Sequence, residues 1–301
     1  MRTLNIISWF DKNTIKHLRI PFSFYLMPVF LFALSQAAII DWAKTISAFV
    51  ILHLFIFPSS NGYNSYQDRD ETSIGGLKHP PKVTKNLYRV TLLFDILAVA
   101  ASLFISVWFS ILILLFVTVS RAYSYRNIRL KKYPFLGFLT VFLFQGAFVY
   151  AMAISAISGF HLQLLLQTGN LLCMSISSMF IGSMYPLTQI YQHEADKKDG
   201  VISISYKLGY NGTFLFSSVL FIVASILMYY YFNLQHQAFD FAVFILLMTP
   251  VILRLMIWAN KVRKDTANAN FENTMTINNL TSACMNLYFL LLIFNSHYNW
   301  F

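Results

Sequence analysis

Residues 135–157 read FLGFLTVFLFQGAFVYAMAISAI, an apolar run without a single charged side chain. A helix needs roughly 20 such residues to cross the hydrocarbon core of a lipid bilayer, which is about 30 Å thick. Lys131 and Lys132 stand before the run, and the next apolar run begins a few residues after it ends. The stretch therefore predicts a transmembrane helix, and the class of the chain depends on how often such runs recur.

Apolar runs of this length recur along the whole chain. Of its 301 residues, 57% are hydrophobic and only 11% are charged, whereas a soluble domain carries about a quarter charged residues. No polar stretch is long enough to form a soluble domain, so we predict a single membrane domain over residues 1–301. It is all-α, with nine transmembrane helices at residues 21–40, 42–58, 88–106, 107–123, 135–157, 161–188, 210–232, 238–257 and 276–295.

The basic residues lie in short clusters between these runs. With nine spans, every Lys and Arg except Lys44 falls on one side of the membrane, and the positive-inside rule places that side in the cytoplasm. We therefore predict a multi-pass protein of the inner, cytoplasmic membrane, with a cytoplasmic N-terminus, an outer C-terminus and no removable signal peptide. The net charge of +10, clustered in this way, favours anionic headgroups and phosphate-bearing ligands over nucleic acid.

A polar segment follows the second predicted span and reads SNGYNSYQDRDE from Ser60 to Glu71. If the second helix continues past Pro58, residues 61, 64 and 68 fall on one helix face, because side chains at i, i+3 and i+7 line up. On composition alone the segment is a solvated loop with a helix cap. A matching cluster elsewhere in the chain favours a functional site instead.

That second cluster ends the sixth predicted span and reads YQHEADKKDG from Tyr191 to Gly200. Residues 192, 196 and 199 fall on one face by the same rule. Two such helix ends, facing each other across a bundle, would suit Mg²⁺, a hard cation that carboxylates and substrate phosphates commonly hold together. Bound to a diphosphate, Mg²⁺ neutralises the charge that builds up as the carbon–oxygen bond breaks. Basic side chains on the same side would donate to the phosphate oxygens: Lys78, Lys82, Arg129, Lys131 and Lys132.

These segments, and the nine spans, resemble the UbiA-type intramembrane prenyltransferases, and the resemblance covers essentially the whole chain. That family has an Asn and three Asp after its second helix, which fall by spacing on Ser60, Asn61, Asn64 and Asp68. Its second pair of Asp falls on Gln192 and Asp196, and Gly200 and Ser203 look like the family's downstream Gly and Thr or Ser. The segment RLKKYP, from Arg129 to Pro134, looks like the basic segment before the family's fifth helix.

The resemblance implies a fold and a site. The nine helices would surround a central cavity open to the cytoplasmic side. Asp68 and Asp196 would be the catalytic anchors, and Mg²⁺ would be held by Asp68, Asn64, Asp196, Gln192 and Asp199. The diphosphate would contact Asn61, Asn64, Lys78, Lys82, Arg129, Lys131 and Gln192. Only two of the five motif aspartates are present, and an amide oxygen ligates Mg²⁺ without contributing charge.

The function that follows is Mg²⁺-dependent transfer of a prenyl chain from a polyprenyl diphosphate to a small acceptor within the bilayer. An aromatic quinone precursor is the acceptor class that the family favours. The alternative is a membrane protein that binds a prenyl lipid on the same scaffold without turnover. A solute transporter would need charged residues in the middle of several spans, and this chain has few. Of these, Asp95 and Asp240 are predicted to lie at membrane interfaces.

Overall fold

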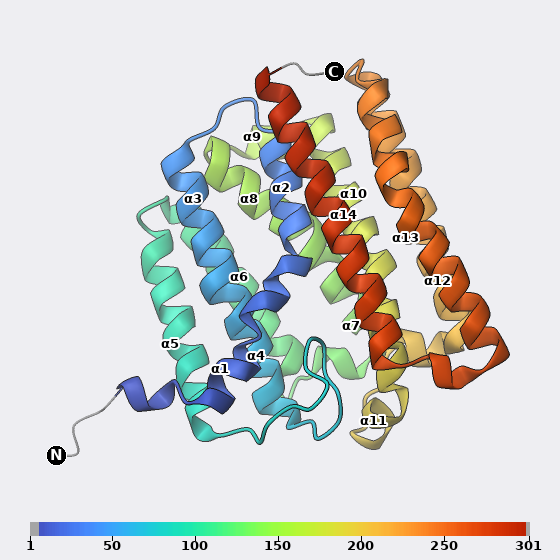
Figure 1. Ribbon diagram of the computed structural model, residues 1–301. Helices are drawn as coiled ribbons and strands as arrows, with labels where there is room; N and C mark the ends of the chain where they lie inside the picture. The colour runs from blue at the N-terminus through green and yellow to red at the C-terminus, as the bar shows by residue number, and fades with distance from the viewer. Residues whose placement is uncertain (1–5, 299–301) are drawn as a thin grey trace. The chain divides into compact units, whose positions relative to one another are not determined.

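The computed structural model describes residues 6–298, and within them the chain is helical, apart from turns and a single isolated bridge between Ile74 and Leu77 (Figure 1). Its internal contacts divide it into two compact units. The first holds the chain up to Phe24 together with Trp42–Leu130, and the second holds Tyr25–Asp41 together with the chain from Lys131 onward. The two motif segments therefore belong to different units, with the first motif in the first unit.

The first unit is built around the helix that carries the first motif. Helix α3 (Trp42–Val50) continues without a break through the π-helical turn η3 (Ile51–Ile56) into α4 (Phe57–Asp68). Pro58 lies directly after this π-helical turn, where the regular i to i−4 hydrogen-bond ladder is already displaced, and the helix continues past it. Helix α4 ends at Arg69, whose left-handed backbone (φ 56°) donates its N–H to the Ser65 carbonyl at 2.9 Å. The prediction that the second helix continues past Pro58 is confirmed.

Two antiparallel neighbours hold α4 in place. Helices α5 (Lys85–Ser102) and α6 (Val107–Ser124) form a hairpin, and both pack against α4. Gly62 permits the close approach of α4 to α5, because a Cβ at that position would lie 2.8 Å from Thr91 Cγ2 and 3.1 Å from Leu87 Cδ1. The short helix α1 (Lys12–Leu18) packs on the same pair and completes a core of Leu18, Leu87, Val90 and Phe94.

The second unit contains the remaining long helices. Helix α13 packs between α12 and α14, and α14 packs on α2 (Figure 1). The bounds are α2 (Met27–Ser35), α7 (Pro134–Val141), η5 (Phe142–Ala147), α8 (Phe148–Ser158), α9 (Leu162–Leu165), α10 (Thr168–Gln189), η6 (Ile190–Gln192), α11 (His193–Lys198), α12 (Ile204–Leu234), α13 (Ala238–Lys264) and α14 (Phe271–Tyr298).

Each of the nine predicted spans corresponds to a helix. Within residues 6–298, eight helical stretches are long and apolar enough to cross a membrane. The third predicted span, α5, has 18 residues but is not among the eight, because it carries Lys85, Arg89 and Asp95. The first span lies nearer the N-terminus than predicted, because the helical stretch runs over Lys12–Ser35, with a 3-10 turn over Ile20–Tyr25, and ends at Ser35. The protein is thus an all-α, multi-pass membrane protein.

Candidate functional site

Side-chain contacts attach the first motif to α6. The hydroxyls of Ser60 and Ser120 lie 2.6 Å apart, and one turn further on Ser124 donates to Asn64 Oδ1 at 2.9 Å. Positions 60, 64 and 68 recur at the spacing of one helix face. The amide oxygen of Asn64 therefore faces α6, on the same side of α4 as the carboxylate that follows it.

That carboxylate, Asp68, forms an ion pair with Arg129 in the segment after α6. Arg129 Nη2 lies 3.3 Å from Asp68 Oδ1, and the two side chains are only 9% and 5% exposed. Arg129 has a left-handed backbone (φ 49°) and donates its N–H to the Tyr125 carbonyl at 2.7 Å, so a tight turn after α6 points it toward α4. The structure thus brings together Asp68 and Arg129, which the sequence predicts as a catalytic anchor and a diphosphate ligand.

Two further arginines hold the backbone of the motif helix. Arg126 Nε donates to the Gln67 carbonyl at 2.6 Å, and its Nη2 donates to the Asp68 carbonyl at 3.2 Å. These contacts satisfy carbonyls that the end of a helix leaves unpaired. Arg19 donates to the carbonyls of Asn61 at 3.0 Å and Gly75 at 2.9 Å, which ties the loop after α4 to the motif.

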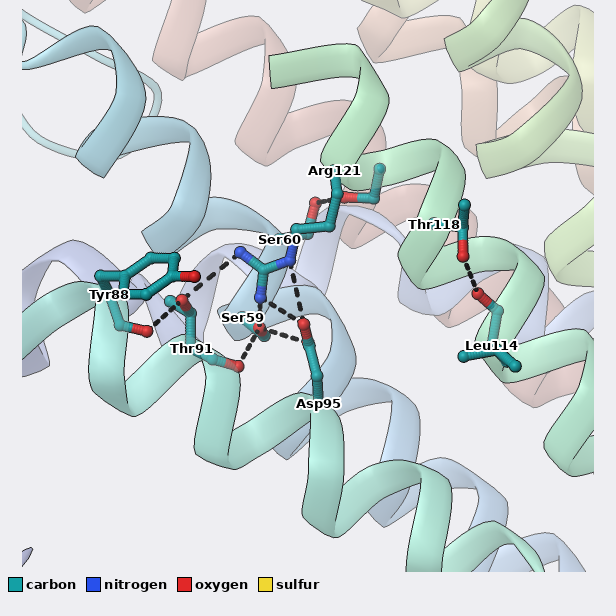
Figure 2. Close-up of polar contacts among 9 residues, drawn as sticks. Ser59, Ser60, Tyr88, Thr91, Asp95, Leu114, Thr118 and Arg121 are labelled. Atoms are coloured by element: carbon teal, nitrogen blue, oxygen red, sulfur yellow. Dashed lines mark hydrogen bonds and ion pairs between the residues drawn. The ribbon is translucent and has the colours of Figure 1, made fainter. Parts of the chain in front are cut away.

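On the N-terminal side of the motif in α4, Asp95 of α5 is buried and forms an ion pair with Arg121 of α6. Figure 2 shows the Arg121 guanidinium reaching between Asp95, Ser59 and Thr91. The Arg121 Nε–Asp95 Oδ2 distance is 2.9 Å, and Ser59 Oγ donates to Asp95 Oδ1 at 2.6 Å. Asp95 thus belongs to a buried pair within the first unit, where Arg121 supplies the compensating charge. Its position at a membrane interface stays a prediction.

The pairing of Asp95 with Arg121 was not predicted from the sequence. Two opposite charges in consecutive apolar helices joined by a short turn were the available signal. Ser120 and Ser124, the α6 partners of the motif, carry no signal of their own, since a hydroxyl is common in membrane helices. Their role depends on their contacts with α4.

The second motif has a different local structure. Helix α10 tightens into the 3-10 turn η6, which ends at Gln192, and the short helix α11 then carries Asp196. Asp199 is the C-cap residue of α11, and Gly200 follows with a left-handed backbone (φ 71°). The predicted helix is therefore interrupted at Gln192, and Asp199 lies just beyond the last helical residue of α11. That residues 192, 196 and 199 share one face stays a prediction.

The predicted lysines lie in two places. Lys78 and Lys82 are exposed in the loop between α4 and α5. Lys131 lies in the 3-10 turn Leu130–Lys132. The carbonyl of the adjacent Lys132 accepts a hydrogen bond from the N–H of Ile202 at 3.4 Å, so this basic turn runs beside the loop after the second motif within the second unit.

An apolar cavity lies within the second unit, between α2, α10, α12 and α14. Aromatic rings line much of it, and α14 adds a few polar side chains. These are Phe32, Phe180, Phe221 and Phe289, with Asn278, Thr281 and Ser282 as the polar contribution of α14. The side chain of Asn278 is buried. Such a lining suits an apolar ligand that carries a small number of polar atoms.

Fold and motif geometry together define a multi-pass, all-helical membrane protein in which carboxylate and amide oxygens stand next to buried cations at a helix end. The model of the UbiA prenyltransferase family matches residues 25–280, and the chain belongs to this family. The resemblance inferred from the two motif segments is thereby confirmed. No curated protein sequence matches the chain.

Solved structures show the same fold. A UbiA homolog from Aeropyrum pernix K1 superposes with a TM-score of 0.70 at 15% identity, over 93% of this chain and 99% of that one. A UbiA homolog from Archaeoglobus fulgidus bound to GPP and Mg²⁺ gives 0.65 at 18% identity, over 94% and 99%. A structure described as digeranylgeranylglyceryl phosphate synthase gives 0.57 at 19% identity, over 94% and 96%. At these identities the likeness shows the fold alone.

The first motif fits a hard cation in the type of its donors but is poor in charge. Asn64 and Asp68 present amide and carboxylate oxygens one turn apart, and Mg²⁺ prefers oxygen ligands. The single motif carboxylate, however, is paired with Arg129. Within the described residues 6–298, no group of three or more His, Cys, Asp or Glu is placed to hold a metal. The motif therefore fits a metal that arrives with an anionic substrate better than it fits a tightly held resident ion.

Proposed function

We propose that this protein transfers a prenyl group from a prenyl diphosphate to a small, aromatic acceptor within the membrane. The observation that supports this most strongly is the buried Asp68–Arg129 pair at the end of α4, with Asn64 one turn before it. A guanidinium beside oxygen ligands at the end of a membrane helix is the arrangement that a diphosphate head requires. Family membership supplies the class of reaction.

The site residues would have separate roles that follow from the chemistry of their side chains. Arg129, Lys78, Lys82 and Lys131 would donate to the diphosphate, with Asn61 and Gln192 as neutral partners. Asp68, Asn64, Asp196, Gln192 and Asp199 would hold Mg²⁺. When bound, Mg²⁺ neutralises negative charge on the departing diphosphate. As the allylic carbon–oxygen bond breaks, the electron pair leaves with the diphosphate, and the cationic side chains stabilise that charge.

The resulting allylic carbon is electron-poor and bonds to a carbon of the aromatic acceptor, which then loses a proton. Water would compete for the same carbon, so the reaction needs an apolar surrounding. Within the second unit, the cavity with Phe32, Phe180 and Phe289 in its wall has an apolar surface of this kind.

The charge distribution supports a cytoplasmic location for both motifs. Arg126, Arg129 and Lys131 follow α6, and Lys197 and Lys198 lie in α11, so both motif segments are accompanied by basic residues. By the positive-inside rule, we propose that both lie on the cytoplasmic side of the inner membrane, with the N-terminus also inside. Prenyl diphosphates, which are anionic and water-soluble at one end, would enter from that side.

One observation favours the second candidate, a prenyl-lipid-binding protein without turnover. Asp68 is already neutralised by Arg129, and amides replace carboxylates at Asn61, Asn64 and Gln192. A site of this charge would hold a diphosphate through its cations and need little metal. The two candidates differ in diphosphate release and in its dependence on Mg²⁺.

The test is release of diphosphate from labelled geranyl diphosphate by the purified protein in lipid nanodiscs, with a panel of aromatic acceptors, with and without Mg²⁺. Asp68→Ala and Asp196→Ala are compared with Asp265→Ala, whose exposed carboxylate caps the turn Thr266–Asn268. The proposal expects acceptor- and Mg²⁺-dependent release that both motif variants abolish and the control retains. Binding of geranyl diphosphate without release under any condition would overturn it in favour of the binding protein.

A further inference from the structure

The Asp95–Arg121 pair lies outside the residues assigned to the substrate, yet it contacts the helix that carries the motif. Its members come from α5 and α6, and Ser59 of α4 completes it, donating to Asp95 and accepting from Arg121 Nη2 at 3.0 Å (Figure 2). The Arg121 guanidinium also lies over the ring of Tyr63, 3.9 Å from the centroid. Tyr63 stands between Asn61 and Asn64, so the pair contacts α4 both before and inside the motif.

Stability alone does not account for this pair. Charged residues in membrane helices are costly and are usually retained for a function. A buried ion pair often adds no more stability than well-packed apolar side chains of the same volume. A charged pair adds specificity for one packing arrangement. The Arg121 guanidinium keeps its hydrogen bonds to Asp95, Ser59 and Thr91 only while the three helices stay in this arrangement.

Contacts with neighbouring helices must fix the position of α4, because its own backbone hydrogen bonds are irregular just before the motif. The π-helical turn η3 covers Ile51–Ile56, and Pro58 follows it. Both features weaken or displace the regular helix bonds, and they are common causes of kinks. Ser59, the first residue after Pro58, is the first point at which α4 contacts the pair.

The interface that begins at the pair continues into the motif. Ser60 contacts Ser120 and Asn64 contacts Ser124, and these two serines of α6 lie on either side of Arg121 in the sequence. A shift of one residue in register rotates a helix by about 100°, since it has 3.6 residues per turn. Such a shift would carry the side chains of Asn64 and Asp68 away from α6 and from Arg129.

We propose that Asp95 and Arg121 are positioning residues that fix the register of α4 against α6, so that Asn64 and Asp68 present their oxygens to the ligand. The pair acts through α4 and makes no contact with substrate. The inference rests on the proposed function only where ligand binding is the readout, because the register itself is a property of the first unit.

The experiment measures register and binding separately. Register is read from disulfide formation in a Ser60→Cys/Ser120→Cys protein in nanodiscs, scored as the linked peptide by mass spectrometry. Binding is read as the equilibrium Kd for geranyl diphosphate in proteins with the native serines. Both are compared among Arg121→Gln, Asp95→Asn and the double variant Asp95→Asn/Arg121→Gln. Thr118→Val is the matched control, since Thr118 on α6 is exposed and its hydroxyl donates to the Leu114 carbonyl of its own helix (Figure 2).

The double variant gives the decisive comparison. Removing both charges leaves no unpaired ion, so we expect the melting temperature of this variant to match that of the parent. We expect its cross-linking to be about tenfold slower, since a disulfide needs Cβ atoms about 3.5–4.5 Å apart. We expect its Kd to rise by about tenfold to a hundredfold. Thr118→Val should match the parent in both.

A folded double variant that cross-links and binds like the parent would overturn the proposal. If geranyl diphosphate does not bind even to the parent, the proposed function fails, and cross-linking alone still tests the positioning role. A variant that cross-links slowly while the parent does so readily supports that role whatever the ligand proves to be.

Discussion

The two motif segments of this protein are held in opposite ways. Helix α4 is continuous through the first motif and is attached to α6 by Ser120 and Ser124, with Asp68 in a buried pair with Arg129. The second motif is divided between the 3-10 turn η6 and the six-residue helix α11, followed by a left-handed glycine. A side chain held by its neighbours is preorganised for a ligand, whereas short helical segments adjust more readily when a ligand binds.

The largest difference is expected between Asp68→Ala and Asp196→Ala. Asp68→Ala leaves Arg129 buried without its carboxylate, and breaking such a pair costs about 3 kcal/mol. Asp196 is half-buried on a six-residue helix, so Asp196→Ala should lower the free energy of unfolding less, by about 1 kcal/mol. Thermal unfolding in nanodiscs, run beside diphosphate release, separates the two. Equal losses of stability in both variants would remove the contrast between the motifs.

A second comparison uses the two glycines of the motifs. Gly62→Ala places a methyl group 2.8 Å from Thr91 Cγ2, which forces α4 and α5 apart and should cost about 2 kcal/mol. Gly200→Ala meets nothing within 4 Å, and only its left-handed backbone (φ 71°) is strained, at about 1 kcal/mol. Chemical unfolding measures both. Gly62→Ala should also weaken geranyl diphosphate binding, and a variant that is destabilised yet binds normally would contradict the role of α4 packing.

The fold was predictable from the sequence because bilayer thickness fixes the length of an apolar run, and all nine predicted spans are helices. The α4 site was predictable in part, since the spacing of Asn61, Asn64 and Asp68 gives one face once the helix passes Pro58. The second motif was not, because no local pattern signals the 3-10 turn that ends at Gln192. The partners Ser124 and Arg121 belong to another helix, and only tertiary packing pairs them with α4.

A negative charge can be added to the first motif by substitution of Asn64. Asn64→Asp keeps the oxygen that accepts from Ser124 and adds a negative charge near Asp68. A cation that takes carboxylate ligands should then bind more tightly, and we expect the Mg²⁺ concentration for half-maximal geranyl diphosphate binding to fall about tenfold. Asn64→Gln, which adds length without charge, is the control. An unchanged Mg²⁺ requirement in Asn64→Asp would exclude position 64 from the metal ligands.

The smallest effect is expected at Asp11, the N-cap of α1, which packs on α4. Burial raises the pKa of its carboxyl, but hydrogen bonds from the Thr14 N–H, the Asn86 amide and the Thr14 hydroxyl outweigh burial and hold the pKa below its ordinary value. A lowered folded-state pKa gives stability that is present above the unfolded pKa of about 3.9 and lost as the pH falls through the folded value.

Asp11→Ala should therefore cost about 1 kcal/mol at neutral pH, the usual value of an N-cap. The difference from the parent should shrink as the pH falls below about 4, which pH-dependent unfolding measures. Lys12→Ala, the adjacent residue without a capping contact, is the control. A constant difference across this range would show that the capping carboxylate does not titrate with folding.

The central claim, that the cation buried beside Asp68 receives the diphosphate, is tested most directly by binding. Radiolabelled geranyl diphosphate is titrated into nanodiscs that hold the parent, Arg129→Gln or Arg89→Gln. Arg89 is the matched control, because it is an exposed arginine of α5 whose guanidinium donates to Asn86 Oδ1 of the same helix. The account predicts that Arg129→Gln raises the Kd by about a hundredfold, as loss of a charge-assisted contact does, while Arg89→Gln changes it little. Parent-like binding by a folded Arg129→Gln protein would contradict it.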